Sequence, residues 1–224
     1  MDLTQTKFSL SRPIQSYSKI QKVYSDFIRN KRWQLAKLNV SKNYLNVGCG
    51  FNLNEQFINL DYQWRPNLDL CWDIRHGIPL ESNSVNGIYS EHCLEHITFE
   101  QVQKVLTEFY RLLKPQGNVR IIVPDAELYI NLYNRSRNGE TVQFPYTEKE
   151  NKDDFSPIMS INSVFRDHGH LYAYDFDCLA LMLKKAGFEL ISKECFMKGR
   201  DPILLIDSEY RKVESLYIEG TKSF

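Results

Sequence analysis

The chain alternates short apolar runs with polar segments, and the apolar runs have the length and composition of buried strands. Several of these runs end at an aspartate or at a turn-forming residue. Two of them, ELIS at 189–192 and SLYIEG at 215–220, come late in the chain. The earlier ones cover 44–47, 57–60, 68–72, 85–89 and the segment VRIIVPD at 119–125.

Helical patterns lie between the predicted strands. The clearest follows the fourth run, where apolar residues recur at steps of three and four: Val102, Val105, Leu106, Phe109, Leu112 and Leu113. KPQG at 114–117 is predicted to end that helix. A second helix is predicted over 174–188, with Asp175 as its N-cap and Gly187 just beyond its end. The spacing of apolar residues over 14–38 predicts one or two more helices.

Strands that alternate with helices predict an α/β fold: a Rossmann-like, doubly wound, mostly parallel sheet with helices on both faces. We predict two parts, an N-terminal helical extension at 1–40 and a main domain at 41–224. Residues 134–167 are polar and include the charge-rich stretch TEKENKDD. They predict an irregular insertion or lid.

Residues that follow the predicted strands indicate a ligand site, because ligands of such sheets bind at the carboxyl ends of the strands. Gly48 and Gly50 follow the first strand and allow a ligand to approach the backbone. Asp61 ends the second and can accept hydrogen bonds from ribose hydroxyls, and Asp73 ends the third and can hold an adenine amino group. The alternative is a tight turn with two solvated carboxylates. Four such residues in this order favour a site for an adenosine-containing cofactor.

The dinucleotide fingerprint G-x-G-x-x-G does not fit this loop. Leu53 stands where the third glycine belongs, and Asp61 follows Gly48 by thirteen residues, whereas the fingerprint has about 20. Residues 51–56 are also too few for a crossover helix of about 10 residues, so a pyrophosphate would lack its helix N-terminus. A cofactor without a pyrophosphate is favoured over NAD, FAD or ATP.

Composition narrows the class of protein. The 42% hydrophobic and 25% charged residues are ordinary for a globular domain, and 28 basic residues balance 28 acidic ones. This balance gives no field that would attract nucleic acid. The five cysteines are dispersed without a CxxC pair, which argues against a structural zinc site or a disulfide framework. We expect a cytoplasmic protein without a membrane span, and the sequence leaves the oligomeric state open.

The order and spacing of these motifs resemble those of a known family. LNVGCG, FINLD, the segment WDIRHGIPLESNSVNGIYSEHCLEHI, then LTEFYRLLKPQGNVRIIVPD and HLYAYDFDCLALMLKKAGF resemble class I S-adenosylmethionine-dependent methyltransferases from about residue 44 to the C-terminus. The nearest resemblance is to small bacterial predicted methyltransferases associated with surface-polysaccharide or glycan modification. The resemblance implies a seven-stranded sheet whose last strand is antiparallel.

The resemblance also implies a set of cofactor-binding residues. The glycines would lie under the methionine part, Asp61 would hold the ribose, and Asp73 with Ile74 would hold the adenine. Asn46 stands where the family usually has an acid, and the residues around 90–92 would line the reactive end. The expected cofactor-binding residues are Asn46, Gly48, Cys49, Gly50, Asp61, Tyr62, Asp73, Ile74, Ser90 and Glu91.

Histidines are the candidates for catalysis. His92 follows the fourth strand, His96 lies one turn further on the next helix, and His170 could close over the site from the insertion. A structural role is the alternative for each, with Glu95 then solvated. His92, Glu95 and His96 also match the H-x-x-E-H zinc signature. The resemblance of the surrounding sequence to the methyltransferases accounts for the same residues, so the sequence predicts no metal site.

The sequence therefore predicts an S-adenosylmethionine-dependent methyltransferase. Its acceptor is expected to be a small molecule or a glycan, methylated at oxygen, with no nucleic acid as partner. A hydroxyl acceptor needs a general base, for which His92, His96 and His170 are the candidates. The alternative is a non-catalytic protein of the same fold that binds the cofactor or serves as a scaffold.

Overall fold

The structure is a computed structural model and describes residues 17–39, 41–147 and 155–223. The first sixteen residues of the predicted N-terminal extension lie outside the described residues, as do residues 148–154 of the predicted insertion. Among the helices in these three ranges, none combines the length and the apolar character that a membrane crossing requires.

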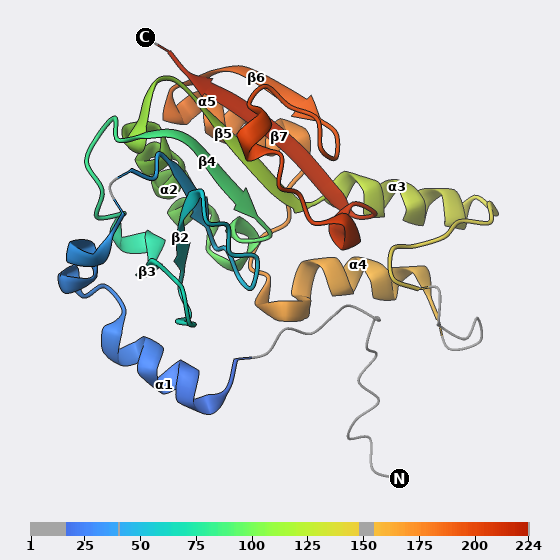
Figure 1. Cartoon of the computed structure of the whole chain (residues 1–224). Helices are drawn as coiled ribbons and strands as arrows, with labels where there is room; N and C mark the ends of the chain where they lie inside the picture. Colours follow the sequence, from blue (N-terminus) through green and yellow to red (C-terminus); the bar gives the residue numbers. More distant parts are fainter. Residues whose placement is uncertain (1–16, 40, 148–154, 224) are drawn as a thin grey trace.

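Seven strands form one sheet in the order β3-β2-β1-β4-β5-β7-β6 (Figure 1). The first five strands are parallel, and β7 is antiparallel to both of its neighbours. The expected doubly wound α/β sheet with an antiparallel last strand is thus confirmed. The strands are β1 (Tyr44–Val47), β2 (Phe57–Asp61), β3 (Leu70–Cys71), β4 (Val85–Glu91), β5 (Leu113–Pro124), β6 (Phe188–Glu194) and β7 (Ser215–Lys222).

Two of the helices follow the predicted patterns. Helix α2 (Phe99–Leu112) begins at a capping box on Thr98, and helix α5 (Phe176–Ala186) begins at Asp175 and ends at the left-handed Gly187. The KPQG segment does not form a loop after α2, because β5 starts directly at Leu113. Its residues instead fall where the register of β5 against β4 shifts, which is a bulge in the strand.

The two faces of the sheet are covered differently. Because side chains alternate along a strand, Leu45, Ile88 and Ile121 join the main core with α2 and α5, whereas Tyr89 and Ile122 face the other way. That second face packs against the segment after β6, which contributes Phe196, Leu204 and Ile206. A short 3-10 helix, η5 (Pro202–Leu204), takes the place of a long crossover helix there.

The predicted irregular segment contains regular structure. Helix α3 (Ala126–Arg137) continues into its beginning, and helix α4 (Pro157–Arg166) lies near its end. Ser156 and Pro157 start α4 in the usual way, and Val164 packs with Tyr129 of α3 and Phe144 in a separate small core. The prediction of irregular structure was wrong for α4. The charge-rich stretch at 147–154 makes the whole segment polar on average, although the residues of α4 itself have apolar residues at helical spacing.

The N-terminal part is helical, as predicted. Helix α1 (Lys19–Ile28) and the 3-10 helix η1 (Arg32–Lys37) lie beside β3. Ser25 and Ile28 of α1 are buried, and Gln34 of η1 hydrogen-bonds the backbone of Cys71 in β3 through both of its amide atoms. The extension is therefore fixed to the edge of the sheet at which β3 ends.

A buried arginine ties the segment between β6 and β7 to the second face. Arg120 of β5 is fully buried and pairs with Asp207 through Nε and Nη2 at 2.8 and 2.6 Å. Its Nη1 donates to Glu219 of β7 at 2.8 Å and to the carbonyl of Lys198. Since both acidic partners are buried, this one guanidinium balances two carboxylates and holds the 195–207 segment in place.

Replacing Arg120 with leucine removes the guanidinium that both carboxylates share. Asp207 then loses its ion-pair partner, and Glu219 is left with Arg200, whose Nη1 lies 3.8 Å from Oε2. We expect Arg120→Leu to lower the free energy of unfolding by about 3–5 kcal/mol, measured by urea denaturation. Arg135→Leu is the matched control, because its partner Glu140 and Arg135 itself are about half exposed. The control should cost at most about 1 kcal/mol. Equal losses in both variants would contradict the role given to Arg120.

Candidate active site

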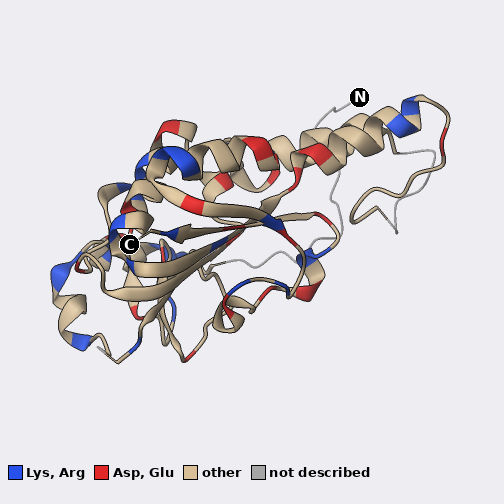
Figure 2. Cartoon of the chain, turned by 90° about the horizontal axis from the view of Figure 1, so that it is seen from above, with Lys and Arg blue, Asp and Glu red and all other residues tan. Residues whose placement is uncertain are grey.

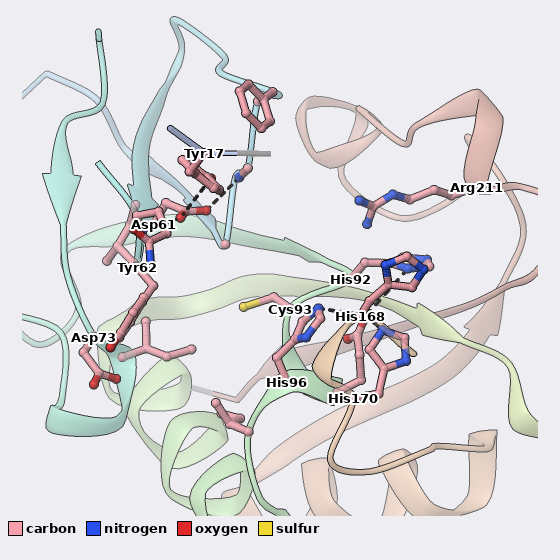
Figure 3. Close-up of a pocket in the computed structure, with 18 of the residues that line it drawn as sticks. Tyr17, Asp61, Tyr62, Asp73, His92, Cys93, His96, His168, His170 and Arg211 are labelled. Atoms are coloured by element: carbon pink, nitrogen blue, oxygen red, sulfur yellow. Dashed lines mark hydrogen bonds and ion pairs between the residues drawn. The ribbon is translucent and has the colours of Figure 1, made fainter. Parts of the chain in front are cut away.

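A cavity of about 740 Å³ lies at the carboxyl ends of the parallel strands. Its walls come from the loops after β1, β2, β3 and β4, and from residues 146, 168–170 and 210–214. Figure 3 shows that Tyr17, Asp61, Tyr62 and Asp73 lie on one side of it, with His92, His96, His168, His170 and Arg211 on the other. Cys93 lies between the two groups. This volume suits a ligand of nucleoside size or larger.

The loop after β1 is bound tightly to the end of β2. The amides of Gly48 and Cys49 both donate to the carbonyl of Leu60, and the amide of Gly50 donates to Asp61 Oδ2 at 2.8 Å. Gly48 has a φ of 66° and lines the cavity. A side chain there would collide with its neighbour, because a Cβ on Gly48 would lie 2.4 Å from Cys93 Sγ. The glycine therefore brings the β1 loop against the β4 loop.

Asp61 is the carboxylate at the centre of the first side. Besides the Gly50 amide, it accepts from the amide of Gln63 at 2.7 Å and from the Tyr17 hydroxyl at 3.4 Å. Its side chain is almost buried, and that burial raises its pKa although these bonds oppose the rise. Tyr17 stacks on Phe51, and the Arg65 guanidinium lies over the Phe51 ring at 3.9 Å. An aromatic and cationic wall thus stands beside the carboxylate.

Asp73 differs from Asp61 because its carboxylate already forms an ion pair with an arginine. Its two oxygens accept from Arg75 Nε at 2.8 Å and Nη2 at 2.7 Å, and also from the Arg75 amide at 3.0 Å. His76 Nδ1 lies 3.2 Å from Oδ2. Burial alone would raise the pKa of Asp73, but the bonds from Arg75 lower it overall. A bidentate ion pair therefore occupies this carboxylate.

A buried carboxylate, Glu95, lies among three histidines on the opposite side. Its Oε1 is 3.6 Å from His92 Nδ1, 3.9 Å from His170 Nε2 and 4.0 Å from His96 Nε2. Glu95 is 1% exposed, so the alternative of a solvated side chain was wrong. His96 belongs to a separate 3-10 helix, η3 (Leu94–His96), because α2 begins only at Phe99. Burial lowers the pKa of His96, which keeps the ring neutral at neutral pH.

The segment before β7 completes the cavity. Ser208 donates through both its amide and its hydroxyl to the Glu91 carboxylate at 2.9 and 2.5 Å, which fixes the segment to the end of β4. Arg211 extends from there into the cavity (Figure 3). Glu214 accepts from the Tyr129 hydroxyl at 2.7 Å and also lines the wall. The carboxylates of Glu91 and Glu95 act electrostatically on this arginine.

Comparison with known proteins identifies the fold and the domain. Residues 35–121 match a family model described as "Methyltransferase domain". The chain thus contains a methyltransferase domain, and its fold is that of S-adenosylmethionine-dependent methyltransferases. Among curated protein sequences, no match to this methyltransferase is found.

Two solved structures share its fold. A methyltransferase from Archaeoglobus fulgidus has 15% sequence identity and a TM-score of 0.51, over 90% of this chain and 94% of that one. A methyltransferase from Thermotoga maritima, described as a possible histamine N-methyltransferase, also has 15% identity, with a TM-score of 0.50. That match covers 85% of this chain and 87% of the other. At this identity the likeness concerns the fold alone.

The residues of the cavity fit S-adenosylmethionine, the cofactor of this class of methyltransferase. The glycine loop leaves backbone exposed beside the cavity at Gly48 and Gly50. Asp61 is held by neutral donors, which ribose hydroxyls can replace. Tyr62 and Ile74 supply apolar surface next to it for a base. Bound there, the cofactor supplies an electrophilic methyl group on a sulfonium.

The structure brings most of the predicted site residues to this cavity. Gly48, Gly50, Asp61, Tyr62, Asp73 and Ile74 line it, as do His92, His96 and His170. The other four do not. Asn46 is buried and donates to Asn59 and to the carbonyl of Asn52, Cys49 and Ser90 are buried, and Glu91 is bonded to Ser208. Of these four, Asn46 and Glu91 hold neighbouring loops through their side chains.

Several residues of the cavity gave no signal in the sequence. Tyr17 precedes the first helix, and Arg211 lies in a segment that matched no motif. Both reach the site only through long-range packing. Glu95 and His168 were visible in the histidine-rich motifs, but their burial and position depend on the fold. A search for charged residues just before the last strand could have found Arg211 and Glu214.

The contact between Gly48 and Cys93 makes a specific prediction. Gly48→Ala places a methyl group against Cys93 as well as forcing an L-residue to positive φ, and we expect about 1–3 kcal/mol of destabilisation from the overpacking alone. Gly139→Ala is the control, since Gly139 has a φ of 87° and a Cβ there would meet nothing within 4 Å. Urea denaturation of both variants measures the difference. Equal destabilisation would show that the Cys93 contact is unimportant.

Proposed function

We propose that this methyltransferase transfers the methyl group of S-adenosylmethionine to a hydroxyl oxygen of a small-molecule or glycan acceptor. The observation that carries the proposal is the cluster of Glu95 and three histidines on the wall opposite Asp61. A hydroxyl is a poor nucleophile until its proton is taken up, and imidazoles are the usual general bases near neutral pH. Such a cluster beside the cofactor loop supports an oxygen acceptor.

His92 is the proton acceptor in this proposal. The Ser215 hydroxyl donates its only hydrogen to the carbonyl of Arg211 at 2.8 Å, so its oxygen must accept from His92 Nε2, which is 2.8 Å away. The lone pair of the neutral His92 ring is then on Nδ1, the nitrogen on the Glu95 side. In the transfer, the acceptor oxygen bonds the methyl carbon as the sulfur–carbon bond breaks. His92 takes the hydroxyl proton, and S-adenosylhomocysteine is left.

The rim of the cavity supports a sugar-like or small polar acceptor. Tyr146 and Tyr210 both line it, and the Tyr146 hydroxyl donates to the carbonyl of Tyr210 at 3.0 Å. Aromatic rings next to carboxylates and histidines suit an acceptor with several hydroxyls. Figure 2 shows that basic and acidic residues are interspersed along the part of the chain that the structure describes. The resemblance to methyltransferases of glycan modification agrees with this acceptor class.

The role of Asp61 can be tested without knowledge of the acceptor. Asp61→Ala removes the acceptor of the ribose hydroxyls, and hydrogen bonds to a charged group are worth about 1.5–3 kcal/mol each. We expect S-adenosylmethionine and S-adenosylhomocysteine to bind at least about 10-fold more weakly, measured by calorimetric titration. Asp177→Ala, at an exposed position on α5, is the control. Unchanged affinity in the Asp61 variant would remove this carboxylate from the cofactor site.

The role of His92 needs turnover. His92→Asn keeps a residue that tolerates the left-handed backbone at this position, where φ is 49°. We expect kcat to fall by about 10²–10⁴-fold while the affinity for S-adenosylmethionine stays the same. The assay measures S-adenosylhomocysteine release with a panel of monosaccharides and nucleoside-diphosphate sugars, against amines of similar size.

Leu190→Asn is the control for the backbone, because Leu190 has a φ of 46° and is exposed away from the cavity. It should leave kcat unchanged. Transfer to amines but to no hydroxyl compound would refute the oxygen acceptor. Full turnover in His92→Asn would refute His92 as its base.

A further inference from the structure

Three electron-pair donors converge at one point of the cavity wall. The ligand atoms of Glu95, His96 and His170 all lie within 4.8 Å of one another. The two nitrogens are 4.0 and 3.9 Å from Glu95 Oε1. These separations are too long for hydrogen bonds. In a tetrahedral metal site with bond lengths of about 2.1 Å, two ligand atoms lie about 3.4 Å apart. The separations found here are slightly longer than that.

The second nitrogen of His170 is fixed in the manner of a metal ligand. Its Nδ1 lies 2.8 Å from the carbonyl of Val164, which can only accept, so Nδ1 carries the hydrogen. The lone pair of the neutral ring is therefore on Nε2, the atom that faces Glu95. Histidines that bind metals in proteins almost always donate their other N–H to a carbonyl or a carboxylate in this way.

His96 is oriented by the same part of the chain. Its ring stands edge-on to that of His170, with the two centroids 4.8 Å apart. The side chain of His96 is 39% exposed, whereas those of Glu95 and His170 are buried at 1% and 4%. The three donors thus form a corner that opens toward the cavity through His96.

The charges around this corner favour a cation. Of the residues that the structure describes, two carboxylates, Glu95 and Glu214, and the Arg211 guanidinium line this part of the cavity. A divalent ion held there would stabilise the charge of the buried Glu95 carboxylate.

We propose that Glu95, His96 and His170 bind one divalent transition-metal ion of the zinc or iron(II) class, and that the ion holds the acceptor hydroxyl. Two imidazoles and one carboxylate form a known donor set for such ions, and an incomplete shell leaves a position for substrate. This inference rests on the proposed function. Coordination lowers the pKa of a bound hydroxyl, and His92, which is outside the three ligands, takes its proton.

The proposal departs from the sequence-based expectation of no metal site. The motif SEHCLEH places Glu95 and His96 together but also suggests His92 as their partner. The fold instead brings His170 from 74 residues further along the chain to complete the three-residue set. His170 directly follows η4 (Asp167–Gly169), and the next two amides, of Leu171 and Tyr172, donate to the carbonyl of Glu95.

The test is metal binding by the purified, chelator-treated full chain. Calorimetric titration with ZnCl₂ gives the stoichiometry and Kd, and the visible spectrum after titration with CoCl₂ reports the ligand geometry. We expect one tight equivalent in the wild type and a Kd at least about 10–100-fold higher in Glu95→Gln and His170→Asn. His76→Asn is the control, since His76 pairs with Asp73 on the other side of the cavity and should leave metal affinity unchanged. Circular dichroism checks that each variant folds.

The outcomes separate this inference from the function on which it rests. A wild type that binds no Zn²⁺ or Co²⁺, or a His170→Asn variant with wild-type affinity, would show a protonated cluster and overturn the metal site. Unchanged methyl transfer by the chelator-treated wild type would overturn the site while the oxygen acceptor stands. One equivalent of metal lost in both variants supports the site even if no hydroxyl compound is methylated. In that case the proposed function alone would fail.

Discussion

The pairing of β1 with β4 at the centre of the sheet is the constraint on which the site depends. Val47 lies beside Ser90 in this pair, so the chain leaves both strands at the same height. The next residues on each side, Gly48 and the pair His92–Cys93, therefore emerge together. From this point the strand order runs one way to β3 and the other way to β6, which opens the crevice. This pairing makes the loop after β1 a neighbour of His92 and Cys93.

The far wall of the cavity is held from the other end of the fold. Arg120 anchors the segment after β6 under the sheet, and the Glu91 carboxylate binds Ser208 at the end of β4. Between these two anchors and β7, the chain has little freedom in presenting Arg211 and Glu214. Glu91 thus acts on the site through the segment it holds, without lining the cavity. Polar residues at strand ends serve the site in two ways, by lining it and by fixing its walls.

This division explains how much the sequence could predict. The strand-end rule identified Gly48, Gly50, Asp61 and Asp73, because each follows a strand whose apolar pattern is plain. The same rule could not distinguish residues that line the cavity from residues that hold its walls in place. Asn46 and Glu91 lie in strands, and their side chains bond neighbouring loops.

Residues supplied by distant segments were beyond local patterns. Tyr17 reaches Asp61 across 44 residues, and His170 meets Glu95 across 75. The helix α4 was missed for another reason, since its apolar spacing adjoins a charged stretch and its core partner, α3, is separate from the main core. The seven strands and the antiparallel direction of the last one, in contrast, followed from the family resemblance.

The two aspartates of the cofactor side have opposite electrostatics, and this bears on how a nucleoside enters. Asp61 is held by amides and a hydroxyl, and burial raises its pKa, so new donors from a ribose would stabilise its charge. Asp73 already has its charge stabilised by Arg75, whose side chain is about one-third exposed. An adenine amino group can reach Asp73 only if that guanidinium turns outward. In the proposed cofactor site, Asp61 is thus ready for a ribose, whereas Asp73 would exchange an ion pair for a neutral hydrogen bond with the adenine. Asp61 should then dominate cofactor affinity.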